Sequence, residues 1–230
     1  MRRKNDSETS LWISTTDLMS GMLVIFLFIA VAMTQNYNTV VQKSNEAQQE
    51  LQENINREFT EEERQKYNLE NVDEGVGYAE FKKGDSRFKI GSAELDPNFK
   101  SELKEFLPKY IRAVAKCNPE TITEVRIEGH TSSEWRGEVL SVDEIYIKNM
   151  ELSQARTRAI LEFALSLPEL EEYKDFMKEK LTANGLSSSK LKRNKDGSED
   201  KEASRRIEFR TIADDAKTMK ELKRLWNEMR

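Results

Sequence analysis

The chain has 230 residues, of which 34% are charged, and a mean hydropathy of −0.76, as in a very soluble protein. This length allows one large domain with appendages and leaves little room for two, since a domain holds about 100–200 residues. A net charge of −5 provides no basic face for phosphates, so no direct nucleic-acid partner is expected. One cysteine and one histidine cannot form an internal disulfide or a His/Cys zinc cluster, so no metal site is expected, and most metalloenzymes and enzymes with a Cys or His nucleophile are excluded.

The average composition hides an apolar segment near the N-terminus. Residues 11–33 read LWISTTDLMSGMLVIFLFIAVAM, and only Ser20 and Gly21 interrupt the apolar run from residue 18 onward. At about 1.5 Å per residue this segment is about 34 Å long, enough to cross a hydrocarbon core of about 30 Å. The segment is therefore predicted to cross a membrane once, as a helix.

The basic residues around this segment indicate its orientation. Arg2, Arg3 and Lys4 precede it, and the next basic residue is Lys43. This asymmetry keeps the N-terminus in the cytoplasm and places the rest on the periplasmic side of a bacterial inner membrane. The alternative is a cleavable export signal ending in the small residues 30–32, which would make the mature chain a secreted or envelope-anchored tether.

Asp17 is the unexpected residue of the segment, because a carboxylate among apolar side chains is costly. Ser14, Asp17, Ser20 and Gly21 are spaced i, i+3, i+6 and i+7, so they share one helix face. Small residues on that face permit close approach of partner helices. Such a carboxylate can carry an ion, but one helix cannot enclose a pathway, so a further membrane subunit is implied. The alternative is that the membrane begins at Leu18 and Asp17 remains in water.

The run WISTTDLMSGM at residues 12–22 resembles the start of the MotB family of ion-carrying stator subunits. Within that superfamily it is most similar to the membrane subunits of the Zorya anti-phage system, as is KEASRRIEFR at residues 201–210. Flagellar MotB is the alternative. The resemblance implies that Asp17 binds the transported ion, H⁺ or Na⁺, with no other cofactor.

The same resemblance implies the partners of the chain. Two copies, a self-dimer, would be enclosed by a ring of about five polytopic MotA-like subunits. In the Zorya interpretation, ion flow, with the proton as the favoured ion, drives rotation or signalling. That signal would recruit cytoplasmic effector proteins, which would be indirect partners of this chain.

Residues 36–67 contain no glycine or proline, and their apolar residues lie mostly four apart: Val40, Ala47, Leu51, Ile55 and Phe59. This spacing predicts an amphipathic helix. We expect a solvated spacer or a short two-stranded coil, with a regulatory plug as the alternative. A loop over residues 71–77 then leads into the next domain.

Beyond residue 76 the pattern alternates between short strands and helices. Helices are expected at residues 97–117, with a kink or break at Pro108, and at residues 149–167. The predicted strands are residues 77–81, 87–91, 125–129 and 204–211. This order predicts an α+β fold, a βαβαβ sandwich with helices on one side of the sheet.

Three runs in this region are similar to the OmpA-like peptidoglycan-binding domain: IEGHT at 127–131, NMELSQAR at 149–156 and SRRI at 204–207. The resemblance covers about residues 76–212. It implies a pocket for the diaminopimelate of the peptidoglycan stem peptide.

The residues that match this pocket are Asn149, Leu152 and Arg156, with Arg156 pairing with a ligand carboxylate. The family has Asp directly after Gly-x-Thr, whereas this chain has Ser132. Either Ser132, Ser133 or Glu134 substitutes for that acid, or wall binding is weaker or altered. The loop over residues 135–147 is also longer than typical.

Other residues receive structural interpretations. His130 is expected to be a hydrogen-bonded structural residue, and Arg205 and Arg206 to point to opposite faces of the last strand. The predicted organisation, in numbers, is a cytoplasmic tail (1–10), a transmembrane helix (11–35), a periplasmic linker (36–75), the OmpA-like domain (76–212) and a C-terminal helix packing on the domain or its twin (213–230).

Overall fold

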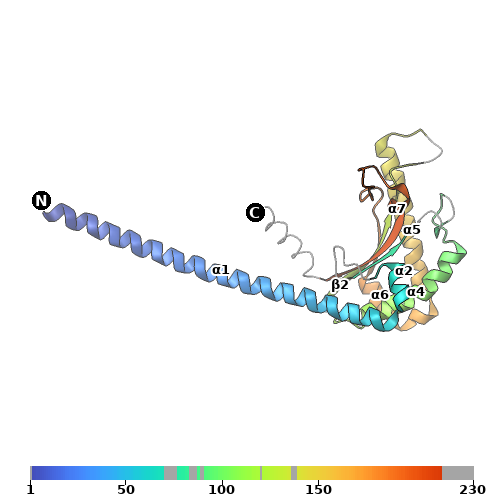
Figure 1. Cartoon of the computed structure of the whole chain (residues 1–230), viewed down its shortest axis with the longest axis horizontal. Helices are drawn as coiled ribbons and strands as arrows, with labels where there is room; N and C mark the ends of the chain where they lie inside the picture. Colours follow the sequence, from blue (N-terminus) through green and yellow to red (C-terminus); the bar gives the residue numbers. More distant parts are fainter. Residues whose placement is uncertain are drawn as a thin grey trace. The chain divides into compact units, whose positions relative to one another are not determined.

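The computed structural model describes residues 2–69, 77–82, 87–88, 91–119, 121–135 and 139–213. Two compact units are present, Met1–Lys43 and Ser44–Arg230. Helix α1, Arg2–Glu58, belongs to both units and is shown in blue in Figure 1. The terminal helix predicted over residues 213–230 lies outside the described residues, except for Ala213.

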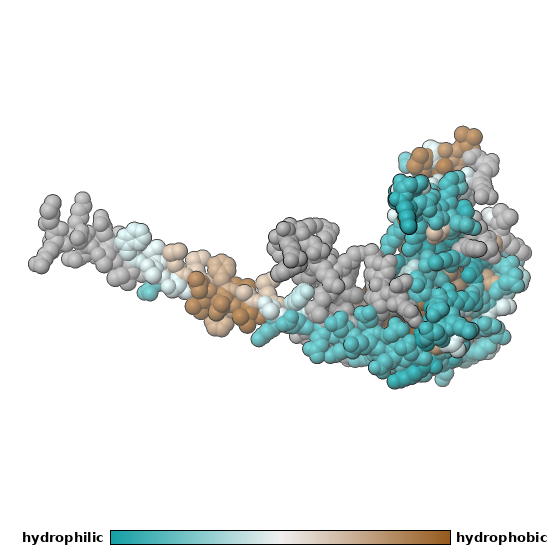
Figure 2. Space-filling model, in the orientation of Figure 1, coloured by the Kyte–Doolittle hydropathy of each residue, from teal (hydrophilic) through white to brown (hydrophobic). Residues whose placement is uncertain are grey.

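The first unit contains a long apolar stretch of α1. Among the described residues, one helix is long and apolar enough to cross a membrane, over Thr15–Gln35, and it appears as the brown section of α1 in Figure 2. The side chains of this stretch are exposed in the isolated chain, with Phe26 at 63% and Phe28 at 69%. An apolar surface of this extent requires a lipid or protein environment.

Helix α1 continues past the apolar stretch without a break, because no glycine or proline occurs between Met22 and Glu58. Helix α2, Glu61–Tyr67, begins at a capping box. The Thr60 side chain accepts a hydrogen bond from the Glu63 N–H, and the Glu63 carboxylate accepts one from the Thr60 N–H. These two bonds fix the turn between the two helices.

The last part of α1 is not a solvated spacer, and the prediction of one was wrong. Ala47, Leu51, Ile55 and Phe59 are all at most 3% exposed and belong to the main hydrophobic core. Asn54 is also buried, and its Nδ2 donates to the Ala113 carbonyl at 3.2 Å. The expected amphipathic face exists, but it packs against the same chain.

The second unit is built on a mixed four-stranded sheet with the order β1-β4-β2-β3. β4 pairs antiparallel with both β1 and β2, while β3 pairs parallel with β2. The strand bounds are β1 Gly77–Phe81, β2 Ile122–His130, β3 Leu181–Gly185 and β4 Arg206–Ala213.

Helices cover one face of this sheet, as predicted. In register, Gly77 pairs with Thr211 and Gly129 with Ile207, so these positions share a face. On that face Leu51 of α1 lies against Gly77, and the Tyr110 hydroxyl of α4, Pro97–Ala115, lies 3.0 Å from the Thr211 hydroxyl. Figure 1 shows these helices beside the curved sheet. The other helices in the described part of the chain are α5 Val142–Ser166, the 3-10 helix η1 Pro168–Tyr173, α6 Lys174–Lys180 and α7 Lys201–Ser204.

Several predicted elements differ in detail from the structure. Pro108 lies inside α4, which remains one helix. The strand expected at 87–91 is reduced, in the described part, to an isolated bridge between Phe88 and Leu95. Sequence patterns missed β3, because its LTANG run at 181–185 is short and has only two apolar residues, Leu181 and Ala183, to mark a strand. The fold class is nevertheless α+β, as predicted.

Candidate functional site

The start of α5 is fixed by a second capping box. The Ser141 side chain accepts from the Glu144 N–H at 3.3 Å, and the Glu144 carboxylate accepts from the Ser141 N–H at 2.8 Å. Two turns later, buried Asn149 donates from Nδ2 to the carbonyls of Ser132 and Glu134, both at 3.2 Å. Asn149 therefore holds the loop that follows β2 against the helix.

α5 packs very closely on the end of β2. A Cβ atom on Gly129 would lie 2.9 Å from the Ser153 carbonyl oxygen and 2.8 Å from Cγ2 of Thr157, so only glycine fits. The Ser153 hydroxyl also accepts from the Ser187 N–H at 3.1 Å, and the Thr131 N–H donates to the Ser187 carbonyl at 2.9 Å. Helix, strand end and the loop after β3 are thus joined at one point.

Arg156 lies two turns beyond Asn149 and is 5% exposed. Its Nε donates to the Ser92 carbonyl at 3.2 Å, and its guanidinium carbon lies 4.7 Å from the centroid of the Phe88 ring. These contacts orient the guanidinium plane. Leu152, one turn earlier, is half-buried. The structure thus brings Ser132 to Asn149, while Arg156 contacts Phe88 and Ser92.

Ser132 is itself buried, and two carboxylates bind groups close to it. Glu199 accepts from the Ser133 N–H at 2.9 Å and from the Ser133 hydroxyl. The Glu134 carboxylate forms an ion pair with Lys201. Glu199 was not predicted, because it is 66 positions away from Ser133 and no local pattern marks it.

The sheet face opposite the helices carries a buried network of charges centred on Glu208, which is 0% exposed. Arg206 Nε donates to Oε1 of Glu208 at 2.5 Å, and the Tyr78 hydroxyl donates to the same oxygen at 3.1 Å. Arg210 donates to Oε2 through Nε at 2.9 Å and Nη2 at 2.6 Å. Its Nε also lies 3.1 Å from Glu128 Oε2, so the network joins β1, β2 and β4.

The charges in this network shift the pKa values of its members. Burial by itself would raise the pKa of the Glu208 carboxyl, but the neighbouring His130 ring and the two arginines hold that pKa far below its usual value. Burial lowers the pKa of His130, against the pull of Glu208 and Glu128. Glu208 is therefore ionised throughout the neutral range.

His130 is 3% exposed, and its Nε2 lies 3.5 Å from Glu208 Oε2 and 3.8 Å from Glu128 Oε2. In the described part of the chain neither ring nitrogen has a hydrogen-bond partner, so the expected bond to His130 is not found there. These three side chains could in principle hold a metal ion, since their ligand atoms lie within 4.8 Å of one another. The guanidinium groups of Arg206 and Arg210 already contact these carboxylates, and their positive charge would oppose the binding of a metal ion.

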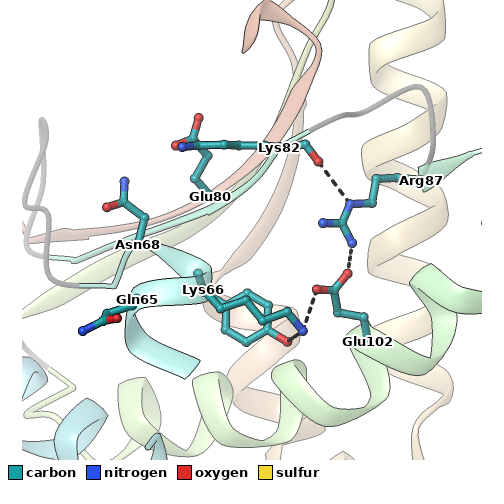
Figure 3. A pocket seen from close by; sticks show the side chains of 8 residues that line it. Gln65, Lys66, Asn68, Glu80, Lys82, Arg87 and Glu102 are labelled. Atoms are coloured by element: carbon teal, nitrogen blue, oxygen red, sulfur yellow. Dashed lines mark hydrogen bonds and ion pairs between the residues drawn. The ribbon is translucent and has the colours of Figure 1, made fainter. Parts of the chain in front are cut away.

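A hollow of about 160 Å³ lies between α2, β1 and α4 (Figure 3). Lys66 binds the Glu102 carboxylate at 3.0 Å, and Arg87 forms an ion pair with the same carboxylate. The Arg87 Nε also donates to the Lys82 carbonyl at 3.2 Å. Most charged groups around this hollow thus bind one another, which favours a structural role in joining α2 to the sheet.

Asp17 lies inside the candidate membrane span Thr15–Gln35 and is exposed in the isolated chain. Ser20 is also exposed, and a Cβ atom on Gly21 would meet no atom within 4 Å. The predicted face therefore has room for a close neighbour. The class of this protein is therefore defined by two parts. One is a candidate membrane helix that bears a carboxylate, and the other is an α+β domain with helices on one face of its sheet.

No protein-family model matches the chain. It is 35% identical over 216 residues to the Zorya protein ZorB of Escherichia coli strain ATCC 8739, covering 91% of this chain and 90% of that protein. The chain therefore belongs to the ZorB family.

Solved structures with lower identity also match. A MotB-like protein of Desulfovibrio vulgaris is 20% identical, with a TM-score of 0.45, covering 76% of this chain and 95% of that one. The periplasmic domain of Helicobacter pylori MotB is 15% identical, with a TM-score of 0.44, covering 70% and 90%. The type VI secretion cell wall anchor of Pseudomonas aeruginosa is 20% identical, with a TM-score of 0.42, covering 63% and 87%.

Proposed function

We propose that this chain is the MotB-like subunit of an ion-driven inner-membrane complex that is anchored to peptidoglycan and acts in Zorya anti-phage defence. The observation that carries the proposal is Asp17, a carboxylate inside the candidate membrane span of a ZorB-family chain. A carboxylate among apolar side chains is costly, and in membrane proteins such groups serve ion pathways. In this proposal the chain catalyses no covalent reaction.

Asp17 binds the transported ion, with H⁺ as the favoured ion and Na⁺ as the alternative. The apolar side chains around Asp17 are exposed in the isolated chain and need a lipid or protein environment. One helix cannot enclose an ion pathway, so the proposal includes a membrane partner. The proposed partner is a MotA-like polytopic subunit, in about five copies around two copies of this chain. Ion passage would then move one part relative to the other and signal to cytoplasmic effectors.

The proposed topology places residues 1–10 in the cytoplasm and the second unit in the periplasm, following the basic residues before the apolar stretch. The mass of the mature protein tests it. A full-length chain supports an anchored subunit, whereas cleavage after Ala32 would remove Asp17 and leave a secreted tether.

The wall-binding site in this proposal lies between α5 and the loop after β2. Asn149 fixes the backbone around Ser132, and Arg156 offers a preoriented guanidinium to a ligand carboxylate. Ser132 lacks the charge of the family Asp. Glu199 and Glu134 provide negative charge nearby for the amino group of diaminopimelate, although each already has a partner.

Retention on isolated sacculi tests wall binding. Arg156→Ala should release the purified chain, because the ligand carboxylate loses its bidentate partner. Arg158→Ala is the matched control, since the Arg158 side chain is 77% exposed and forms an ion pair with Glu162 on the helix surface. Equal retention of the two variants would contradict the proposed pocket.

Co-purification from the native host tests the partner. A MotA-like protein encoded with the defence system should accompany the tagged chain. Recovery of flagellar basal-body parts would instead support a flagellar stator role.

A further inference from the structure

The beginning of α5 carries an apolar patch that the proposed function does not use. Val139 is 105% exposed, Val142 82%, Ile147 55% and Tyr146 37%. We call these four residues the α5 patch; Figure 2 shows a brown area at the tip of the second unit, where α5 begins. Side chains of this kind lose contact with water favourably, so a cluster of them marks an interaction surface.

A hollow of about 390 Å³ adjoins the patch, and its lining carries three carboxylates and one ammonium group. Its lining residues are Leu140, Asp143, Glu144, Ile147, Lys148 and Glu151. The surface thus combines an apolar floor with net negative charge. It is complementary to a segment that carries apolar side chains flanked by basic ones.

The chain itself contains such a segment, KTMKELKRLWNEMR at residues 217–230, which lies outside the described residues. It has five Lys or Arg and two Glu. In a helix its apolar residues would share one face, because they recur at intervals of three or four: Met219, Leu222, Leu225 or Trp226, and Met229. The segment is therefore complementary to the patch, because it has basic residues for the carboxylates and apolar residues for the apolar side chains.

The end of β4, after which this segment begins, lies far from the patch of the same copy, and the proposed complex contains a second copy. β4 ends at Ala213, which pairs with Ile122 at the start of β2. The patch lies near the other end of β2, because the Ser187 hydroxyl donates to the Tyr146 carbonyl and the Thr131 N–H donates to Ser187. A strand of nine residues separates the two ends by about 26 Å.

We propose that residues 217–230 of one copy bind the α5 patch of a second copy. Reciprocal exchange of the two segments would form a closed two-fold contact. This inference rests on the proposed function only for the presence of two copies. It concerns neither ion transport nor wall binding, so its test can fail or succeed independently of both.

Disulfide crosslinking of the full-length chain in membranes tests the proposal. One copy carries Val142→Cys and one tag, and a co-expressed copy carries Trp226→Cys and a different tag. The native Cys117 is buried, and burial raises its pKa to about 11, so it should react little. Mild oxidation should produce a reducible dimer with both tags.

Two control variants test whether the crosslink is specific to the α5 patch. Glu162→Cys, an exposed position near the other end of α5, replaces Val142→Cys and should give no such dimer. Ile147→Asp in the Val142→Cys copy should reduce the crosslink to the level of this control. Absence of the two-tag dimer would overturn the proposal. A single chain that carries both Val142→Cys and Trp226→Cys gives a second test, because a disulfide formed only within that chain would also overturn the proposal.

Discussion

Gly129 of β2 and Ser153 of α5 approach so closely that a Cβ atom on Gly129 would lie 2.9 Å from the Ser153 carbonyl oxygen. α5 also carries Asn149 and Arg156, the candidate wall-binding side chains. The contact between strand and helix backbone therefore sets the distance of these side chains from the loop after β2.

Gly129→Ala should destabilise the second unit by about 1–3 kcal/mol, because the backbone of α5 has to move away. Denaturant unfolding of the purified chain measures this as a lower midpoint at an unchanged slope. Thr157→Ser in the same chain removes Cγ2 at 2.8 Å but leaves the Ser153 carbonyl, so it should restore only part of the loss. Native stability of Gly129→Ala would contradict this account.

Glu208→Gln should destabilise the unit by about 3–5 kcal/mol, since it leaves two buried guanidinium groups without their shared carboxylate. Glu162→Gln is the matched control, because its partner Arg158 is exposed and the pair contributes little. Thermal unfolding of the two variants should differ clearly. Similar melting temperatures would show that the network around Glu208 is not important for stability.

Acidification should weaken the fold in two steps. The pKa of His130 is lowered from 6.5, so below about pH 6.5 the unfolded chain takes up the proton more readily and stability falls. The pKa of Glu208 is lowered from 4.5, so its contribution is complete above that pH and decreases as the pH falls further. Unfolding free energies measured from pH 8 to pH 4 test this, and His130→Gln should remove the upper step. A native pH profile in that variant would exclude His130 as its origin.

Leu51→Ala should destabilise the second unit by about 2–5 kcal/mol, because Leu51 is fully buried in its core. Asn56→Ala, at an exposed position of the same helix, is the control. Denaturant midpoints of the two variants distinguish an integral helix from a solvated spacer. Equal midpoints would support the spacer.

Sequence patterns predicted the features that depend on local periodicity. The apolar run around Phe26, the line from Ala47 to Phe59 and the alternation at residues 206–210 all mark elements that the structure contains. Which surface an amphipathic face covers depends on the tertiary fold, so the burial of Leu51 in the domain core could not be read from spacing. β3 was missed for a different reason, because its five residues carry too few apolar side chains to mark a strand.

The candidate site was predictable where motifs mark it and not elsewhere. Asn149 lies in one resembling run and Ser132 directly follows another, and the Asn149 side chain donates a hydrogen bond to the Ser132 carbonyl. Glu199 reaches Ser133 only through the long loop after β3, and Glu208 binds Tyr78 of β1 and lies beside His130 of β2. Contacts of such sequence separation leave no local pattern.

The central claim is that the Asp17 carboxylate carries the ion that drives the complex. The most direct measurement is protection against phage in cells with the complete defence system, comparing Asp17→Asn with Asp6→Asn, the same change outside the candidate span. The account predicts that Asp17→Asn inserts and assembles normally but gives no protection, whereas Asp6→Asn protects fully. Full protection by Asp17→Asn would contradict it.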